Sequence, residues 1–314
     1  MAINKTLESK WRYHFSILLF GASGVLIKLI QLPALTIVVG RFFISALTLL
    51  VFFIVRRKLR HVWRIDKKSL LYMLLGGLLL ALHGWAFISS IQWSSVAVGT
   101  ITFACFPVFS LIFEKIFFRK SSEIRPYMII SAVIVLLGAV VLVPEFSFGS
   151  INTRGVLIGL VSALAFALLL ILNNKIRIAI TAKNSKAKEI GIVTTFYEHL
   201  FTALILLPIT LIMEPLGGLP LQMKDAVLLI ILGMIVTAVG FSMYYSALRF
   251  HNPTTISIAS SLEAVYGIGF ALLIMRTIPE IREIVGGIII TAAVAFNEFC
   301  KRRGNIAASR AQRD

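Results

Sequence analysis

A single acidic side chain stands out because it lies in the middle of a long apolar segment. Residues 253–275 are long enough to cross a hydrocarbon core of ~30 Å as one helix, at ~1.5 Å per residue. Glu263 lies about 15 Å from the start of this segment, which is the middle of a bilayer. A carboxylate at that depth is costly unless it is protonated, paired or in contact with water, so it indicates a site for substrate binding or proton coupling. The alternative is a structural hydrogen bond to a neighbouring helix.

The composition identifies lipid as the main solvent of this chain. Of its 314 residues, 58% are hydrophobic and 14% are charged, against roughly 25% charged residues in a soluble domain. The net charge of +17 would suggest nucleic acid in a soluble protein. Here the basic residues lie in short loops between apolar runs, which is the pattern of membrane orientation. We therefore predict an integral membrane protein whose partner is the lipid bilayer, without nucleic-acid binding.

Ten apolar runs follow one another, and each is predicted to be a helix because backbone groups in lipid must be satisfied within the segment. The first run has no convincing small-residue cleavage site and nine runs follow it, so it is predicted to be a span rather than a signal peptide. The fold class is accordingly an all-α integral membrane protein. The runs cover residues 15–31, 34–55, 70–91, 96–118, 126–143, 155–173, 190–213, 225–247, 253–275 and 283–299.

The basic residues predict the orientation of these helices. Most of the 31 lysines and arginines fall on one side of the membrane, with the largest cluster in residues 56–68. Because positively charged loops stay in the cytoplasm, we predict that both termini are cytoplasmic in a multi-pass protein of a plasma membrane, such as a bacterial inner membrane. Residues 301–314 would then form a polar cytoplasmic tail, which we expect to be disordered after Arg303.

The two halves of the chain carry a weak internal repeat. Residues match at one constant offset over several consecutive spans, and the predicted repeats cover residues 1–145 and 150–300. Five spans is an odd number, so the two halves enter the membrane from opposite sides. This makes an inverted repeat, which is typical of alternating-access carriers with a central site. The matches include Ala46 with Ala203, Gly76 with Gly233, Ser89 with Ser246 and Ile101 with Ile258.

Two opposite charges occupy mirrored depths under this repeat. Arg41 lies about 10 Å from the outer surface, and its counterpart Glu198 lies about 12 Å from the inner surface. We take them as gate candidates, which either pair directly or each hold one gate. The alternative is that Arg41 extends to the surface, while Glu198 is satisfied by His199 or by a backbone carbonyl.

Further residues are candidates for substrate binding or coupling. His83 lies inside the third span with Phe87 one turn further on the same face, and it is either a proton-coupling residue or a structural donor. Pro107 is expected to kink the fourth span, and interrupted helices at corresponding places are where transporter sites occur. The other candidates, in the fourth and ninth spans, are Thr102, Phe106, Ser260 and Tyr266.

Other conspicuous residues are expected to be structural. Tyr244 and Tyr245 lie near the inner end of the eighth span, where an interfacial aromatic belt is the simplest explanation. Gly155 and Gly159 give the sixth span a small face that allows close packing. The two cysteines have neither disulfide nor metal-ligand spacing, so no metal and no cofactor is predicted.

In its repeat order the chain resembles the EamA-type permeases of the drug/metabolite transporter superfamily. The resemblance covers nearly the whole chain, and it implies a substrate cavity between the third, fourth, eighth and ninth spans, with the first and sixth spans helping to gate it. The chain departs from the family pattern after Glu263, where the family often has proline. The resemblance is carried by Gly40-Arg41-Phe42, Phe106-Pro107-Val108 and Glu263-Ala264-Val265.

These features favour a secondary transporter over other classes of protein. No catalytic or phosphate-binding motif is present in the sequence, so an enzyme is not expected. The prediction is a carrier for a small molecule, exporting an amino acid or related metabolite by alternating access, with proton coupling or exchange. The alternatives are uptake or exchange of a nucleotide-like, sugar or cationic drug substrate and, more remotely, a non-transporting scaffold or a channel. Monomer and homodimer both remain open.

Overall fold

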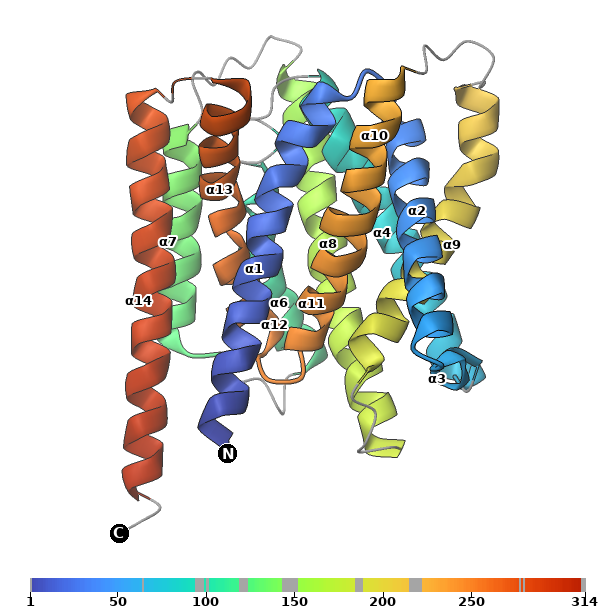
Figure 1. The fold of residues 1–314 in the computed structure, drawn as a ribbon. Helices are drawn as coiled ribbons and strands as arrows, with labels where there is room; N and C mark the ends of the chain where they lie inside the picture. Colours follow the sequence, from blue (N-terminus) through green and yellow to red (C-terminus); the bar gives the residue numbers. More distant parts are fainter. Residues whose placement is uncertain are drawn as a thin grey trace.

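The computed structural model describes residues 2–63, 65–93, 99, 102–118, 124–142, 152–183, 189–214, 222–276, 278 and 280–311. Every element in this part of the chain is a helix (Figure 1). Seven of the described helical spans are long and apolar enough to cross a membrane. With the shorter apolar helix α7 and with α1 and α6, they make up the ten spans of the fold.

The described helices overlap the predicted apolar runs, but the first, sixth and tenth helices extend well beyond them, to Ala2, Lys183 and Ala311, and one helix is additional. A short helix, α3 (Leu59–Trp63), lies in the basic loop between the second and third spans and was not predicted from the sequence. The continuous helices are α1 (Ala2–Leu29), α2 (Ala34–Val55), α4 (Lys67–Trp93), α6 (Phe106–Phe117), α7 (Pro126–Leu142), α8 (Asn152–Lys183), α9 (Ile190–Met213) and α14 (Ile281–Ala311).

The eighth and ninth spans are each built from three segments. The eighth passes from α10 (Met223–Ile231) through the π-helix η2 (Leu232–Val239) to α11 (Gly240–Ala247). The ninth consists of α12 (Pro253–Ser260), α13 (Leu262–Phe270) and the π-helix η3 (Ala271–Met275). Helices with i→i+5 bonding are rare and occur frequently at functional sites. The eighth and ninth spans are therefore candidates for the functional site.

Local sequence explains several helix ends. Pro33 precedes α2 and Pro253 opens α12, because proline at a helix start loses no hydrogen bond that the helix would make. The Asn252 side chain accepts a hydrogen bond from the Thr255 N–H at 2.9 Å and so caps α12. At the other end of this span Arg276 adopts a left-handed conformation, with φ of 55°, and stops η3.

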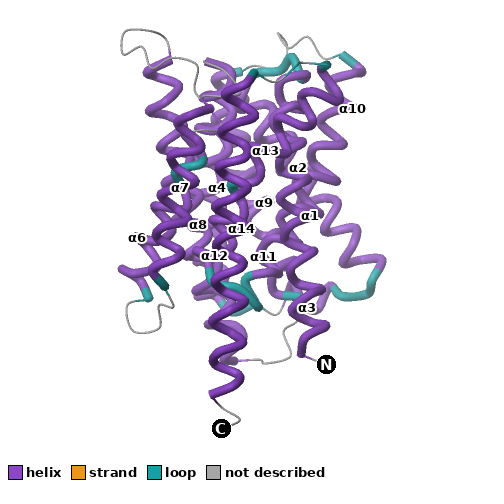
Figure 2. Tube along the Cα trace, turned by 90° about the vertical axis from the view of Figure 1, so that its left-hand side faces the viewer, coloured by secondary structure: helices purple, strands orange, loops and turns teal. Residues whose placement is uncertain are grey.

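Both chain ends lie at the same end of the helical bundle, together with α3 and the start of α12 (Figure 1). In this bundle α4 packs on α8, α7 on α14, and α2 on α9. The α14 helix projects beyond its neighbours at this end (Figures 1 and 2). The expectation of a disordered tail is wrong for residues 304–311, because α14 continues through them to Ala311.

The inverted repeat is visible in how the two halves pack. A Cβ added to Gly77 on α4 would lie 2.6 Å from Phe201 Cβ and 3.1 Å from the Glu198 carbonyl of α9. A Cβ added to Gly233 on η2 would lie 2.7 Å from Ile44 Cβ and 3.0 Å from the Arg41 carbonyl of α2. Each half therefore presents a glycine on its third span to the second span of the other half. The contacted residues, Ile44 with Arg41 and Phe201 with Glu198, correspond under the repeat offset.

The sixth span packs closely, as its small face predicts. The Ser90 hydroxyl of α4 donates to the Gly155 carbonyl of α8 at 2.7 Å. A Cβ on Gly159 would overlap the Thr102 side chain, so this glycine is required for the close approach.

Candidate substrate site

Two interrupted helices meet near the middle of the bundle. In the ninth span the helix breaks at Ser261, whose N–H donates to the Ile258 carbonyl at 3.2 Å. In the fourth span it breaks at Ala104 and Cys105, and the Cys105 N–H donates to the Thr102 carbonyl at 3.2 Å. Ala104 and Ser261 correspond under the repeat, so each half of the protein contributes one break. Interrupted helices at matching places in the two halves are the structural mark of a transporter site.

Pro107 takes part in the first of these breaks in a way that differs from the prediction. A kink within a continuous helix was expected at Pro107. Instead a new helix, α6, begins at Phe106 and places Pro107 in its first turn, where proline is well tolerated. The break therefore precedes Pro107 instead of being centred on it.

A small cavity of about 10 Å³ lies between the two breaks, enough for about one water molecule. The fourth span contributes Phe103, Ala104 and Phe106, and the ninth contributes Ser260, Ser261, Glu263 and Ala264. The structure thus brings together three of the predicted site residues, namely Glu263, Phe106 and Ser260. This volume is too small for a metabolite, so the site is closed to a substrate in this conformation.

Arg41 lies in electrostatic range of this cavity. Its side chain is only 5% exposed, and its guanidinium carbon lies 4.8 Å from the centre of the Phe42 ring. It interacts electrostatically with Glu263, and also with His83 and His199. Arg41 Nε has no hydrogen-bond partner among the described residues. A buried guanidinium nitrogen without an acceptor is costly, so this side chain is suited to bind an anionic group.

The direct pair between Arg41 and Glu198 that the repeat suggested is not formed in this conformation. Glu198 is fully buried, and its Oε2 accepts a hydrogen bond from Asn173 Nδ2 at 3.2 Å. Gly76 lies so close to this carboxylate that an added Cβ would overlap Oε1. His199 Nδ1 bonds the Ser45 hydroxyl at 2.7 Å. The repeat offset correctly relates Arg41 and Glu198, but it does not require that they touch.

Aromatic rings form one wall of the site. His83 Nδ1 bonds the Ser162 hydroxyl at 2.9 Å, and the His83 ring lies 5.9 Å from that of Phe87. The Phe103 ring lies 5.3 Å from His83 and 4.9 Å from Phe106, which joins the histidine to the cavity lining. Phe166 of α8 packs on the same group, with its ring 4.6 Å from that of His83.

The assignment of Tyr244 to an interfacial belt is wrong. This side chain is completely buried, and its hydroxyl lies 2.9 Å from the Ser260 hydroxyl in the cavity lining. Its position follows from the packing of α11 against α1, which turns it toward the ninth span. A tyrosine near the end of a span cannot be distinguished by sequence from a belt residue.

The remaining predicted candidates lie at the edge of the site. Thr102 donates to the Gly99 carbonyl at 3.2 Å, just before the break in the fourth span. Tyr266 is partly buried against α1, where a Cβ on Gly21 would lie 2.5 Å from Tyr266 Cβ and 3.1 Å from the Glu263 carbonyl. The α1 helix therefore covers the side of α13 that carries Glu263.

Two buried acids, Glu114 and Asp225, were not predicted as functional residues. Glu114 of α6 is 3% exposed, and its Oε2 accepts hydrogen bonds from the N–H and the hydroxyl of Thr254. This contact joins the fourth span to the start of the ninth at the end of the bundle that carries both termini. An acid within the apolar run 96–118 was the available signal.

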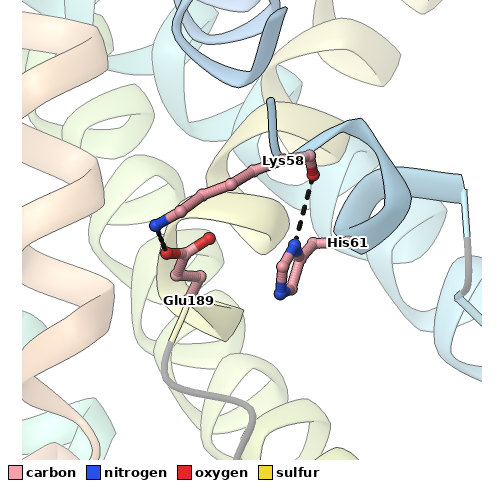
Figure 3. Close-up of polar contacts among 3 residues, drawn as sticks. All are labelled: Lys58, His61 and Glu189. Carbon is pink, nitrogen blue, oxygen red and sulfur yellow. Dashed lines mark hydrogen bonds and ion pairs between the residues drawn. The ribbon is translucent and has the colours of Figure 1, made fainter. Parts of the chain in front are cut away.

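Polar contacts also tie α2 and α9 together at both ends. At one end Lys58, which follows α2, forms an ion pair with Glu189, which precedes α9 (Figure 3). At the opposite end Glu214, which follows α9, accepts hydrogen bonds from the backbone N–H groups of Leu35 at 3.2 Å and Thr36 at 2.8 Å. The two links join the ends of the pair of helices that carries Arg41 and Glu198.

No group of three or more histidine, cysteine, aspartate or glutamate side chains among the described residues is placed to hold a metal ion. The cavity lining offers the Glu263 carboxyl group and the rings of Phe103 and Phe106, and the Arg41 guanidinium interacts electrostatically with Glu263. Such an arrangement can recognise a small charged molecule.

Two five-helix repeats of opposite orientation around a mid-membrane site define a multi-pass, all-α membrane protein. The profile described as "EamA-like transporter family" matches residues 15–143 and again residues 153–298. The chain belongs to the EamA-like transporter family. A search of curated proteins finds no match. One solved structure, described as "Crystal structure of protein", has a TM-score of 0.75 over 94% of this chain and 98% of that chain, at 14% identity, and it supports the fold alone.

Proposed function

We propose that this protein is a secondary transporter that exports an amino acid or a related small metabolite by alternating access. The observation that carries the proposal is the pair of repeat-related helix breaks on either side of a small cavity at Glu263. Helix breaks supply backbone groups and local mobility at mid-membrane depth, where an intact helix offers neither. A closed volume between them corresponds to an occluded stage of such a cycle.

The side chains around the cavity support a zwitterionic substrate. Glu263 lines the cavity and complements an ammonium group, while the nearby buried Arg41 complements a carboxylate. Phe103 and Phe106 supply apolar surface for a side chain. An amino acid carries all three features in one small molecule, whereas a sugar lacks both charges and a cationic drug lacks the carboxylate.

Glu263 also supplies a route for coupling. A carboxylate at mid-membrane depth is costly unless it is protonated, paired or in contact with water, so a proton and a substrate ammonium are alternative partners for Glu263. Proton uptake and substrate binding at Glu263 would then exclude one another, which is the logic of a proton-coupled exporter. If Glu263 serves substrate alone, the protein works as an exchanger.

The basic residues support an orientation with both termini in the cytoplasm. The end of the bundle that carries the termini also carries the cluster of lysines and arginines around α3 (Figure 1). With this orientation, export begins from the end of the bundle that carries both termini.

Counterflow in proteoliposomes tests the function directly. Purified protein is reconstituted with a panel of amino acids, nucleosides, sugars and cationic drugs inside the vesicles, and uptake of the labelled counterpart is measured. An amino acid is expected to give counterflow, and accumulation against a gradient is expected when a proton gradient is imposed. Counterflow of sugars or cationic drugs but of no amino acid would refute the proposed substrate class.

The variant Glu263→Gln separates the two roles of the carboxyl group. Loss of proton-driven accumulation with counterflow retained assigns coupling to Glu263, and loss of both assigns substrate binding. The matched control is Glu280→Gln, which changes an exposed acid just before α14 that forms an ion pair with Arg282. If Glu263→Gln transports and accumulates like the control, Glu263 is structural and the proposed site is wrong.

A further inference from the structure

A second cavity, of about 260 Å³, lies at the end of the bundle that carries both termini. It is bounded by the start of α7, the start of α12 and the projecting part of α14. It shares no lining residue with the small cavity at Glu263. Its volume is below the ~300–1,000 Å³ that is usual for small-molecule pockets, so it suits one polar group better than a whole metabolite.

The lining of this cavity is basic. Arg125 stands at the start of α7, and Lys301 reaches in from α14 to donate a hydrogen bond to His251 Nδ1 at 3.1 Å. No carboxylate occurs among the described residues that line it. Glu114 is bound to Thr254, and Glu298, one turn before Lys301, accepts a hydrogen bond from the Tyr13 hydroxyl at 3.2 Å. The described lining therefore carries basic side chains and no acidic one.

A buried hydroxyl in the lining is available to a ligand. Thr255 is completely buried, and its Oγ1 has no hydrogen-bond partner within the described part of the chain. Its backbone N–H is already engaged by Asn252, so the hydroxyl alone is left. A buried hydroxyl without a partner is costly, and a bound acceptor would satisfy it.

The position of the cavity points to the membrane surface. Phe250, which lies in its lining, is 46% exposed, as is usual for aromatic side chains at the interface between lipid and water. Arginine, lysine and a hydroxyl are the donors that bind phosphate oxygens, with arginine able to bind two of them at once. Basic pockets between membrane helices on the cytoplasmic side are suited to anionic lipid head groups.

We propose that this cavity binds a phosphate group, supplied by the head group of an anionic phospholipid or by free phosphate. Arg125 and Lys301 bind the phosphate oxygens, and the Thr255 hydroxyl donates the third hydrogen bond. The bound group joins α7, α12 and α14, and it stabilises the end of the ninth span opposite to η3. This site is independent of the transported substrate.

The test uses the full chain purified in detergent, with the midpoint of thermal unfolding as the readout. The probes are monomeric short-chain phosphatidylglycerol, short-chain phosphatidylcholine and inorganic phosphate. Phosphatidylglycerol is expected to raise the Tm saturably and more than phosphatidylcholine does. Arg125→Gln and Lys301→Gln are each expected to raise its apparent Kd about tenfold, which corresponds to about 1.4 kcal/mol. Arg302→Gln is the matched control, since Arg302 is the exposed neighbour of Lys301 and does not line the cavity.

The inorganic phosphate arm distinguishes the two sources. Stabilisation by phosphate that competes with phosphatidylglycerol supports free phosphate as a ligand, whereas stabilisation by phosphatidylglycerol alone supports the lipid. If Lys301→Gln fails to fold, Thr255→Val, which keeps the shape of the side chain, is expected to weaken binding several-fold. Equal effects of the two lipids, or unchanged affinity in Arg125→Gln and Thr255→Val, would overturn the proposal.

Discussion

The crossing of α1 and α13 is the contact on which the closed site depends most directly, and Gly21→Ala perturbs it. A Cβ at Gly21 would lie 2.5 Å from Tyr266 Cβ, 3.1 Å from the Glu263 carbonyl and 3.1 Å from the Gly267 nitrogen. Carbon atoms in ordinary contact are ~3.5–4.0 Å apart. Two of the three neighbours are backbone atoms, so α1 and α13 must separate by about 1 Å to admit the methyl group.

The cost of this separation can be estimated against a control on the same pair of helices. Overpacking of this kind costs about 1–3 kcal/mol. Alanine also gains helix propensity over glycine, up to about 1 kcal/mol, and this gain is shared by any Gly→Ala change within a helix. Gly269→Ala is the matched control, because its added Cβ would have no heavy atom within 4 Å. The difference between the two variants therefore isolates the packing term.

Thermal unfolding of the purified variants measures this difference. A cost of about 1–3 kcal/mol lowers the Tm of Gly21→Ala relative to Gly269→Ala by about 2–12 °C, at about 2–4 °C per kcal/mol. The counterflow rate of Gly21→Ala is expected to fall as well, because a state that requires α1 against α13 becomes less populated. If Gly21→Ala and Gly269→Ala unfold at the same temperature and transport equally, the close crossing of α1 and α13 is not a feature of the working protein.

Three further predictions concern Arg41, Lys58 and the orientation in the membrane. A double-mutant cycle on substrate affinity is expected to show coupling above about 0.5 kcal/mol between Arg41→Gln and Glu263→Gln. The effects of Arg41→Gln and Glu198→Gln are expected to be additive. Coupling of Arg41 with Glu198 but not with Glu263 would show that Arg41 and Glu198 pair directly. Lys58→Gln is expected to change the free energy of unfolding by less than about 1 kcal/mol, since its ion pair with Glu189 is partly exposed, and a larger loss in denaturant titration would show that the link at this end is rigid. A single cysteine at Arg60 is expected to react with an impermeant thiol reagent only after the cells are opened, and labelling of intact cells would reverse the proposed orientation.

Much of the fold could be predicted from hydropathy, because lipid leaves a chain few choices. An apolar run in a bilayer must form a helix to satisfy its backbone, so the described helices overlap the predicted runs. The short helix α3 was missed because it lies in a polar loop, where this constraint does not act. The extension of α14 to Ala311 was missed for the same reason, since no membrane defines where a helix ends in water.

The site could be predicted only in part. Glu263 was evident from its depth, and Phe106 with Pro107 marked a weak point in the fourth span. The corresponding break at Ser261 has no neighbouring proline or glycine that would predict it from the sequence. The interaction of Arg41 with Glu263 could not be predicted either. The depth of a residue along a span does not give the direction in which its side chain points.

The sequence by itself determined that this chain is an integral membrane protein, that its spans are helices and that its halves repeat in opposite orientation. These follow from the cost of exposing backbone and charge to hydrocarbon, which acts on each segment separately. The tertiary structure decided which charges meet, because the rotation of each helix depends on the side chains of all its neighbours at once. It turned Tyr244 inward to Ser260, placed Arg41 within electrostatic reach of Glu263, and left Glu198 with Asn173. Contacts between helices far apart in sequence are a property of the packed whole, and no single segment carries them.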